Sequence, residues 1–120
     1  PELIAAIEKC PSAMISKAGQ AGAVAALEDQ EYYQEVKKKI VEGMTYLETQ
    51  MAELGCKVYH SQTNFILFDP HIDAQLVRSK MMEAGIMISA PGLCRVSVST
   101  MDNNRLFIKT LKEIMGKQSD

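Results

Sequence analysis

Apolar residues recur at spacings of three and four along residues 30–54, and this pattern predicts one long amphipathic helix. The apolar stripe of this helix is made by Tyr33, Val36, Ile40, Met44, Leu47, Met51 and Leu54. The basic triplet at residues 37–39 falls off the stripe, so we expect it on a solvated face and not in a nucleic-acid patch. Gly55 is expected to end the helix, because glycine adopts the left-handed backbone that follows a helix without steric cost.

Two shorter helices are expected before the long one. Residues 2–9 place Leu3, Ile4 and Ile7 on one face, and Pro11 ends this segment because the residue before a proline is pushed out of the helical region. Residues 15–28 are rich in alanine and almost free of charge. A helix with so little side-chain bulk is typical of a place where another element approaches closely. No partner for it is evident within this chain.

Short strand-like runs follow the long helix. Strands are expected over residues 57–60, 63–68, 86–88 and 94–99, and the second is too apolar to have a solvent-exposed face. A helix over 72–84 carries Leu76, Val77, Met81 and Ala84 inward, and a last helix with Thr100 as N-cap buries Leu106, Phe107, Thr110, Leu111 and Ile114. Helices followed by β-β-α-β-β-α predict an α+β fold with a sheet covered by helices.

Size and charge narrow the function classes. The 120 residues suit one ordinary domain, and the formal net charge of −2 removes the electrostatic reason to expect nucleic acid or anionic lipid as a partner. No apolar run is long enough to cross a bilayer and no signal-peptide pattern is visible, so we expect a cytoplasmic protein. The three cysteines are far apart and form no CxxC pair, which argues against disulfides and against a zinc site.

Arg95 is the first candidate for a binding residue. In the strand over 94–99, Val96 and Val98 share one face, while Arg95, Ser97 and Ser99 share the other. An arginine at a strand start, beside a Pro-Gly turn, can present its planar guanidinium to a carboxylate. The alternative that periodicity leaves open is a surface arginine in a local ion pair.

Five other residues with reactive or polar side chains are expected to be structural. Nothing around Lys17 supplies the desolvation or the neighbouring cation that activates an amine. His60 and His71 have no partner at metal-ligand spacing and are expected at the surface. Cys94 is expected to be buried and inert, because it points away from the face of the arginine beside it. Asn64 is expected to be a hydrogen-bonded strand-edge residue. No metal site is predicted.

Three segments, in the correct order and over nearly the whole chain, resemble the C-terminal part of fold type I pyridoxal-phosphate aminotransferases. Residues 85–104 are similar to the family's Gly-Ile strand, loop, second strand and Asn-opened helix, with the second strand reading Leu93-Cys94-Arg95-Val96-Ser97-Val98-Ser99-Thr100. Residues 61–68 are similar to its Ser-x-x-Asn-Phe-[hydrophobic]-Leu-Phe strand. Residues 20–33 resemble the helices that precede its small domain. The histidinol-phosphate aminotransferase branch resembles the chain most.

This resemblance implies that residues 1–29 are an interdomain helical segment and that residues 30–120 are a C-terminal small domain. The reaction would be amino transfer between an amino acid and a 2-oxo acid, and the family's arginine for the substrate α-carboxylate maps onto Arg95. The Schiff-base lysine and the other cofactor ligands of the family lie upstream of the matching region. Pyridoxal 5'-phosphate would therefore be bound by an upstream large domain, the full enzyme would be a homodimer, and this chain alone would be inactive, with no catalytic or cofactor-binding residue.

Three points stay open. Ser89 occupies a position where histidinol-phosphate aminotransferases commonly have an arginine for the distal phosphate of the substrate, so a phosphorylated substrate is left open. An amino-acid-phosphate decarboxylase of the same fold is a second candidate. A third is a non-enzymatic α+β binding or dimerisation module, since small domains of this type also act without chemistry.

Overall fold

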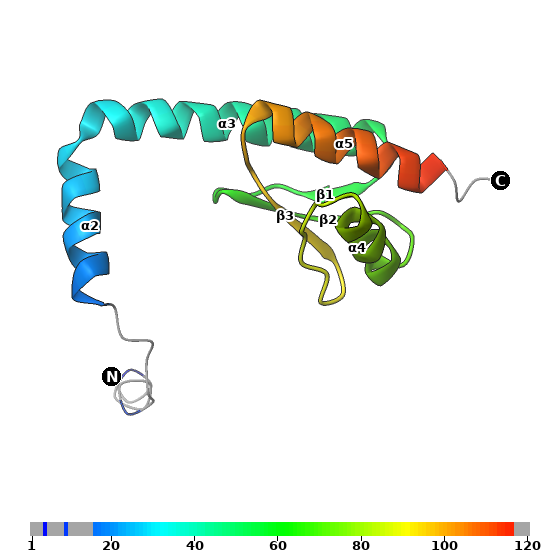
Figure 1. Cartoon of the computed structure of the whole chain (residues 1–120), viewed down its shortest axis with the longest axis horizontal. Helices are drawn as coiled ribbons and strands as arrows, with labels where there is room; N and C mark the ends of the chain where they lie inside the picture. The colour runs from blue at the N-terminus through cyan, green and yellow to red at the C-terminus, as the bar shows by residue number, and fades with distance from the viewer. Residues whose placement is uncertain (1–3, 5–8, 10–15, 117–120) are drawn as a thin grey trace. The chain divides into compact units, whose positions relative to one another are not determined.

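The structure, a computed structural model, describes Ile4, Lys9 and residues 16–116. The chain forms two units, with their boundary between Glu35 and Val36. The helices and strands are labelled in Figure 1. The helix predicted over residues 2–9 lies outside the described residues, apart from Ile4 and Lys9. Among the described helices, none combines the length and the apolar character that a membrane span requires.

Helix α2 (Lys17–Glu28) corresponds to the predicted alanine-rich helix. Ser16 is its N-cap, and the Ser16 hydroxyl accepts a hydrogen bond from the Gly19 N–H at 3.0 Å. None of its residues is buried by the described part of the chain, and both Val24 and Leu27 are more than half exposed.

Helix α3 (Gln30–Glu53) confirms the predicted long helix, and Gly55 follows it with the expected positive φ of 84°. Only the C-terminal part of the predicted stripe is buried, through Met44, Leu47 and Met51, whereas Tyr33 is exposed. The lysines of the basic triplet are exposed, as predicted.

A three-stranded antiparallel sheet, in the order β1-β2-β3, carries the rest of the fold and confirms the α+β class. The strands are β1 (Lys57–Tyr59), β2 (Phe65–Asp69) and β3 (Cys94–Ser97). Helices α4 (Ala74–Glu83) and α5 (Met101–Gly116) join α3 in a single core with one face of this sheet. The sheet side of the core is Ile66, Phe68, Cys94 and Val96, and the Phe68 ring meets the Phe107 ring edge to face at 6.0 Å.

The strand predicted over residues 86–88 is wrong. Only one bridge exists there, between Ser89 and Arg95, whose backbones exchange hydrogen bonds of 3.1 Å and 2.7 Å. Ile88 and Ala90 on either side of Ser89 are buried in the core. The chain is therefore held in place mainly by side-chain packing, and it turns at residues 91–93 before a ladder can extend.

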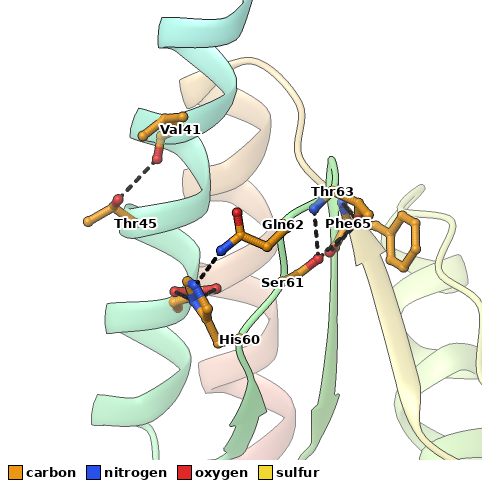
Figure 2. A network of polar contacts seen from close by, with 8 residues as sticks. Val41, Thr45, His60, Ser61, Gln62, Thr63 and Phe65 are labelled. Atoms are coloured by element: carbon orange, nitrogen blue, oxygen red, sulfur yellow. Dashed lines mark hydrogen bonds and ion pairs between the residues drawn. The ribbon is translucent and has the colours of Figure 1, made fainter.

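The prediction that the second strand has no exposed face is also wrong. Burial alternates along β2: Ile66 and Phe68 are buried, while Phe65, Leu67 and Asp69 are only half-buried. The helices cover one face of the sheet and leave the other open in the described part of the chain. The strand also starts at Phe65 instead of Thr63, because Thr63 is held in a turn by the Ser61 hydroxyl, which accepts its N–H at 3.1 Å (Figure 2).

Helices α4 and α5 differ in detail from the predicted faces. Ala84 follows α4 as its C-cap and is exposed, whereas Val77 and Met81 are buried as predicted. On α5, Thr100 accepts the Asn103 N–H at 3.4 Å, consistent with the predicted N-cap. Leu106 was expected to be buried but is 48% exposed, because the core-facing side of α5 is centred on Asn104, Phe107, Ile108, Thr110, Leu111 and Ile114.

Gly43 of helix α3 faces the stretch of chain that follows β3. A Cβ atom at this position would lie 2.6 Å from Val98 Cγ1 and 2.9 Å from Asn104 Nδ2. These distances are shorter than side-chain packing allows, so only glycine fits between α3 and this part of the chain.

We expect Gly43→Ala to lower the free energy of unfolding by about 1–3 kcal/mol, the usual cost of adding a methyl group to a filled core. Chemical denaturation followed by circular dichroism measures this change. Gly22→Ala is the matched control, because it adds the same methyl group to a helix at a site with no atom within 4 Å. Equal stability of Gly43→Ala and the unchanged chain would contradict the packing argument.

Candidate functional site

The open face of the sheet carries a row of side chains that crosses the strands. The register pairs Tyr59 with Leu67, Leu67 with Arg95, and Arg95 with Ser89. Directly paired residues project to the same side of a sheet, so all four lie on the face that the helices leave open. Ser89 is thus a direct neighbour of Arg95 across the bridge.

Arg95 is exposed on this face and is supported by an aromatic ring. Its guanidinium carbon lies 5.1 Å from the centre of the Phe65 ring. Phe65 is the diagonal neighbour of Arg95 in the register, at a separation that long side chains span. A cation–π contact of this kind is worth about 0.5–1 kcal/mol at an exposed site and restricts where the guanidinium points.

Within the described residues no carboxylate forms an ion pair with Arg95, and no described group accepts a hydrogen bond from its guanidinium. Asp69 is the other diagonal neighbour of Arg95, but one of its oxygens accepts the His71 N–H at 2.8 Å and the other lies 3.7 Å from His71 Nδ1. The guanidinium leans on the ring and its N–H donors remain available. The local ion pair left open by the periodicity is absent from the described residues.

A second cation stands on the same face, at its far edge. Lys57 is paired with Asp69 in the register, and its ammonium nitrogen lies 5.2 Å from the centre of the Tyr59 ring. Arg95 differs from Lys57 because its planar fork can hold both oxygens of a carboxylate at once. The open face therefore offers one geometrically specific anion-binding group, with a small hydroxyl residue beside it.

The two histidines are exposed, as predicted. His60 Nδ1 lies 3.2 Å from the Glu48 carboxylate of α3, and His60 Nε2 lies 3.4 Å from the Gln62 amide (Figure 2). His71 sits in a turn with a φ of 57°. No cluster of three or more histidine, cysteine or acidic side chains suited to a metal ion occurs in residues 16–116.

Lys17 is exposed at the start of α2, and every other lysine that the structure describes is exposed too. Asn64 acts through its main chain, whose carbonyl accepts the Val98 N–H at 2.8 Å. The sequence analysis missed the supporting role of Phe65. The strand register is the signal that reveals it, because residues 65 and 95 are not neighbours in any pattern along the chain.

Cys94 lies on the buried face, opposite to Arg95, which confirms the prediction of a buried thiol. Burial raises the pKa of Cys94 from 9.0 to about 11, and the nearby Asp69 and Asp73 carboxylates add to this effect. Burial raises the pKa of Cys56 in the same way. Both thiols stay protonated near neutral pH and are poor nucleophiles.

These thiols predict a loss of stability at alkaline pH. Between pH 9.0 and about 11 the folded chain keeps both protons while the unfolded chain releases them, so the free energy of unfolding falls as pH rises through this window. Thermal melts across the window measure the fall. The Cys56→Ala/Cys94→Ala double variant should show a weaker pH dependence, and an unchanged slope would refute the assignment.

The sequence and the fold of this chain are both similar to those of known proteins. The sequence pattern of aminotransferase class I and II matches residues 2–111. The histidinol-phosphate aminotransferase of Brevibacillus brevis is 36% identical over 103 residues, which are 81% of this chain and 28% of that protein. The crystal structure of histidinol-phosphate aminotransferase from Sinorhizobium meliloti, in complex with pyridoxal-5'-phosphate, superimposes with a TM-score of 0.72 at 30% identity, over 86% of this chain and 31% of that one.

A decarboxylase from Sulfurospirillum multivorans superimposes with a TM-score of 0.68 over 95% of this chain and 36% of that one, but at 22% identity this likeness shows the fold alone. The chain spans 28% of the length of the Brevibacillus brevis enzyme, and also 28% of the histidinol-phosphate aminotransferase of Desulfotalea psychrophila. The family match covers most of the chain, and the matched residues include the sheet and the arginine on its open face. This chain belongs to the aminotransferase class I and II family.

Proposed function

We propose that this chain is the substrate-carboxylate-binding C-terminal domain of a pyridoxal-phosphate-dependent aminotransferase. The whole enzyme would move an amino group between an amino acid and a 2-oxo acid, as a homodimer in the cytoplasm. The observation that carries the proposal is the state of Arg95, which is exposed on the open sheet face, leans on Phe65 and forms no ion pair within the described residues. The N–H donors of an arginine in this state are available to bind an anionic ligand.

Arg95 would bind the α-carboxylate of the substrate with two parallel N–H···O bonds. Charge-assisted bonds contribute roughly 1.5–3 kcal/mol each, enough to orient a small amino acid. The Phe65 ring reduces the rotamer freedom that the arginine would otherwise lose on binding. Ser89 and Leu67, paired with Arg95 on either side, would then lie beside the bound carboxylate.

Among the residues that the structure describes, none is suited to hold the cofactor covalently. When bound, pyridoxal 5'-phosphate supplies an electron sink for bond breaking at the α-carbon of an amino acid. The lysine that holds such a cofactor must be desolvated or lie beside another cation to react at neutral pH, yet every described lysine is exposed. The cofactor would therefore be held by an upstream domain of a longer polypeptide, consistent with the share of its relatives that this chain spans.

Helix α2 supports a role as part of a larger enzyme over a free-standing module. The helix is rich in alanine and glycine, a composition typical of a helix that another element approaches closely. Its small side chains would let an upstream domain approach the helix backbone closely. We propose accordingly that α2 belongs to an interdomain segment.

In the full-length enzyme, Arg95→Ala should raise the KM for the amino acid substrate by about 100-fold or more, because both charge-assisted bonds are lost. Arg95→Lys should give a smaller increase, since lysine keeps the charge without the planar fork. Steady-state kinetics and a cofactor-binding titration measure these effects, and cofactor affinity should not change.

Arg78→Ala is the matched control, because Arg78 is an exposed arginine on α4, a helix that packs on the opposite face of the sheet. It should leave the KM unchanged. Kinetics of Arg95→Ala equal to those of the unchanged enzyme would remove the proposed role of this site.

The isolated chain should neither turn over amino acids nor attach the cofactor at a defined lysine. Borohydride reduction of a mixture with pyridoxal phosphate, followed by peptide mass spectrometry, should find only scattered modification at a low level. Stoichiometric labelling of a single lysine would show instead that this chain carries its own cofactor site.

A further inference from the structure

The connection between β3 and α5 is held by one buried amide. Asn104, in the first turn of α5, is only 2% exposed. Its Oδ1 accepts the Ser99 N–H at 3.0 Å, and its Nδ2 donates to the Ser99 carbonyl at 3.2 Å. One side chain thus satisfies both main-chain groups of Ser99, as a paired strand would.

The amide has little freedom to move. The glycine of α3 at position 43 faces it so closely that a Cβ there would come within 2.9 Å of Asn104 Nδ2. On the other side of the chain, the N–H of Val98 donates to the Asn64 carbonyl at 2.8 Å. The side chain of Asn103, by contrast, is exposed, and among the described residues it bonds only the Ser99 hydroxyl, at 3.0 Å. The main chain at residues 98–99 is therefore fixed from both sides.

This clamp lies at the end of the strand that carries Arg95. The ladder between β2 and β3 has four residue pairs, from Phe65↔Ser97 to Phe68↔Cys94, and its register is specified by the burial of Cys94 and Val96 on one face. A slip by one residue would exchange the two faces of β3 and turn Arg95 toward the core. The Ser89 bridge holds the start of the strand, and the Asn104 amide holds its end.

We propose that Asn104 is a positioning residue for Arg95: its amide holds the main chain at the end of β3 and thereby restrains where the guanidinium lies on the open face of the sheet. The inference rests on the proposed function only in that the ligand of Arg95 is the substrate carboxylate. Asn104 itself touches no substrate. It acts through the strand. Replacing Asn104 should therefore change substrate binding only in an enzyme that has Arg95.

A double-mutant cycle in the full-length enzyme tests this role. Asn104→Ala should raise the KM for the amino acid substrate by roughly tenfold. In the Arg95→Ala background, the same substitution should raise the KM no further, because the arginine that it positions is already gone. Asn103→Ala is the matched control and should leave the KM unchanged in both backgrounds.

Asn104→Asp provides a second variant in case Asn104→Ala does not fold. It keeps the size of the side chain and the acceptor for the Ser99 N–H, and it loses the donor to the Ser99 carbonyl. Its KM should rise in the enzyme with Arg95 and stay unchanged in the Arg95→Ala background. Amide hydrogen exchange at residues 95–99 should be faster in either variant than in Asn103→Ala.

The possible failures are distinguishable. If Arg95→Ala alone leaves the KM unchanged, the proposed function fails. If Arg95→Ala raises the KM but the Asn104 variants do not, or raise it by the same factor in both backgrounds, the positioning role fails and the proposed function stands.

Discussion

The one-sided burial of the sheet is the constraint on which the rest of this structure depends. Helices α3, α4 and α5 pack against a single face, and the side chains that they enclose include Leu47, Phe68 and Leu111, all fully buried. Burying side chains of this size stabilises a small domain by about 1.5–3 kcal/mol each, and the described chain has no comparable interaction elsewhere. Every second residue of β2 and β3 is buried in this core.

The alternate residues of β2 and β3 are not part of this core. Phe65, Leu67 and Arg95 occupy the open face because the strand period leaves them no other place. On a face without covering helices, an arginine avoids the cost of desolvation and keeps its donors for a ligand. The ring of Phe65 limits its motion without neutralising its charge, which distinguishes Arg95 from an arginine engaged in a surface ion pair.

The sequence patterns predicted long elements well and short ones poorly. Helix α3 was predicted to within a residue at its C-terminus, because a stripe over many turns averages out local exceptions. The strand over residues 86–88 failed because three apolar residues carry no period of their own. Ile88 is buried by packing of its side chain and not by membership of the sheet, and apolar character alone does not separate these two cases.

Within the candidate site, too, the sequence predicted what depends on the period of one strand and missed what depends on pairing between distant residues. The alternation of residues 94–99 and the family resemblance pointed to Arg95 and to the buried thiol beside it, since both depend on the two-residue period of one strand. Phe65, Ser89 and Asn104 were not evident as its neighbours or supports, because each meets β3 through pairing or packing across a turn.

The sequence by itself thus determined the class of the fold, the long helix and the face of Arg95, all properties of local periodicity. Only the tertiary structure decided which sheet face is open, which ring the guanidinium contacts and how the end of the strand is held. These depend on contacts between residues far apart along the chain, such as the approach of α3 at Gly43 to the amide of Asn104. Such contacts follow from packing and register, which no local pattern specifies.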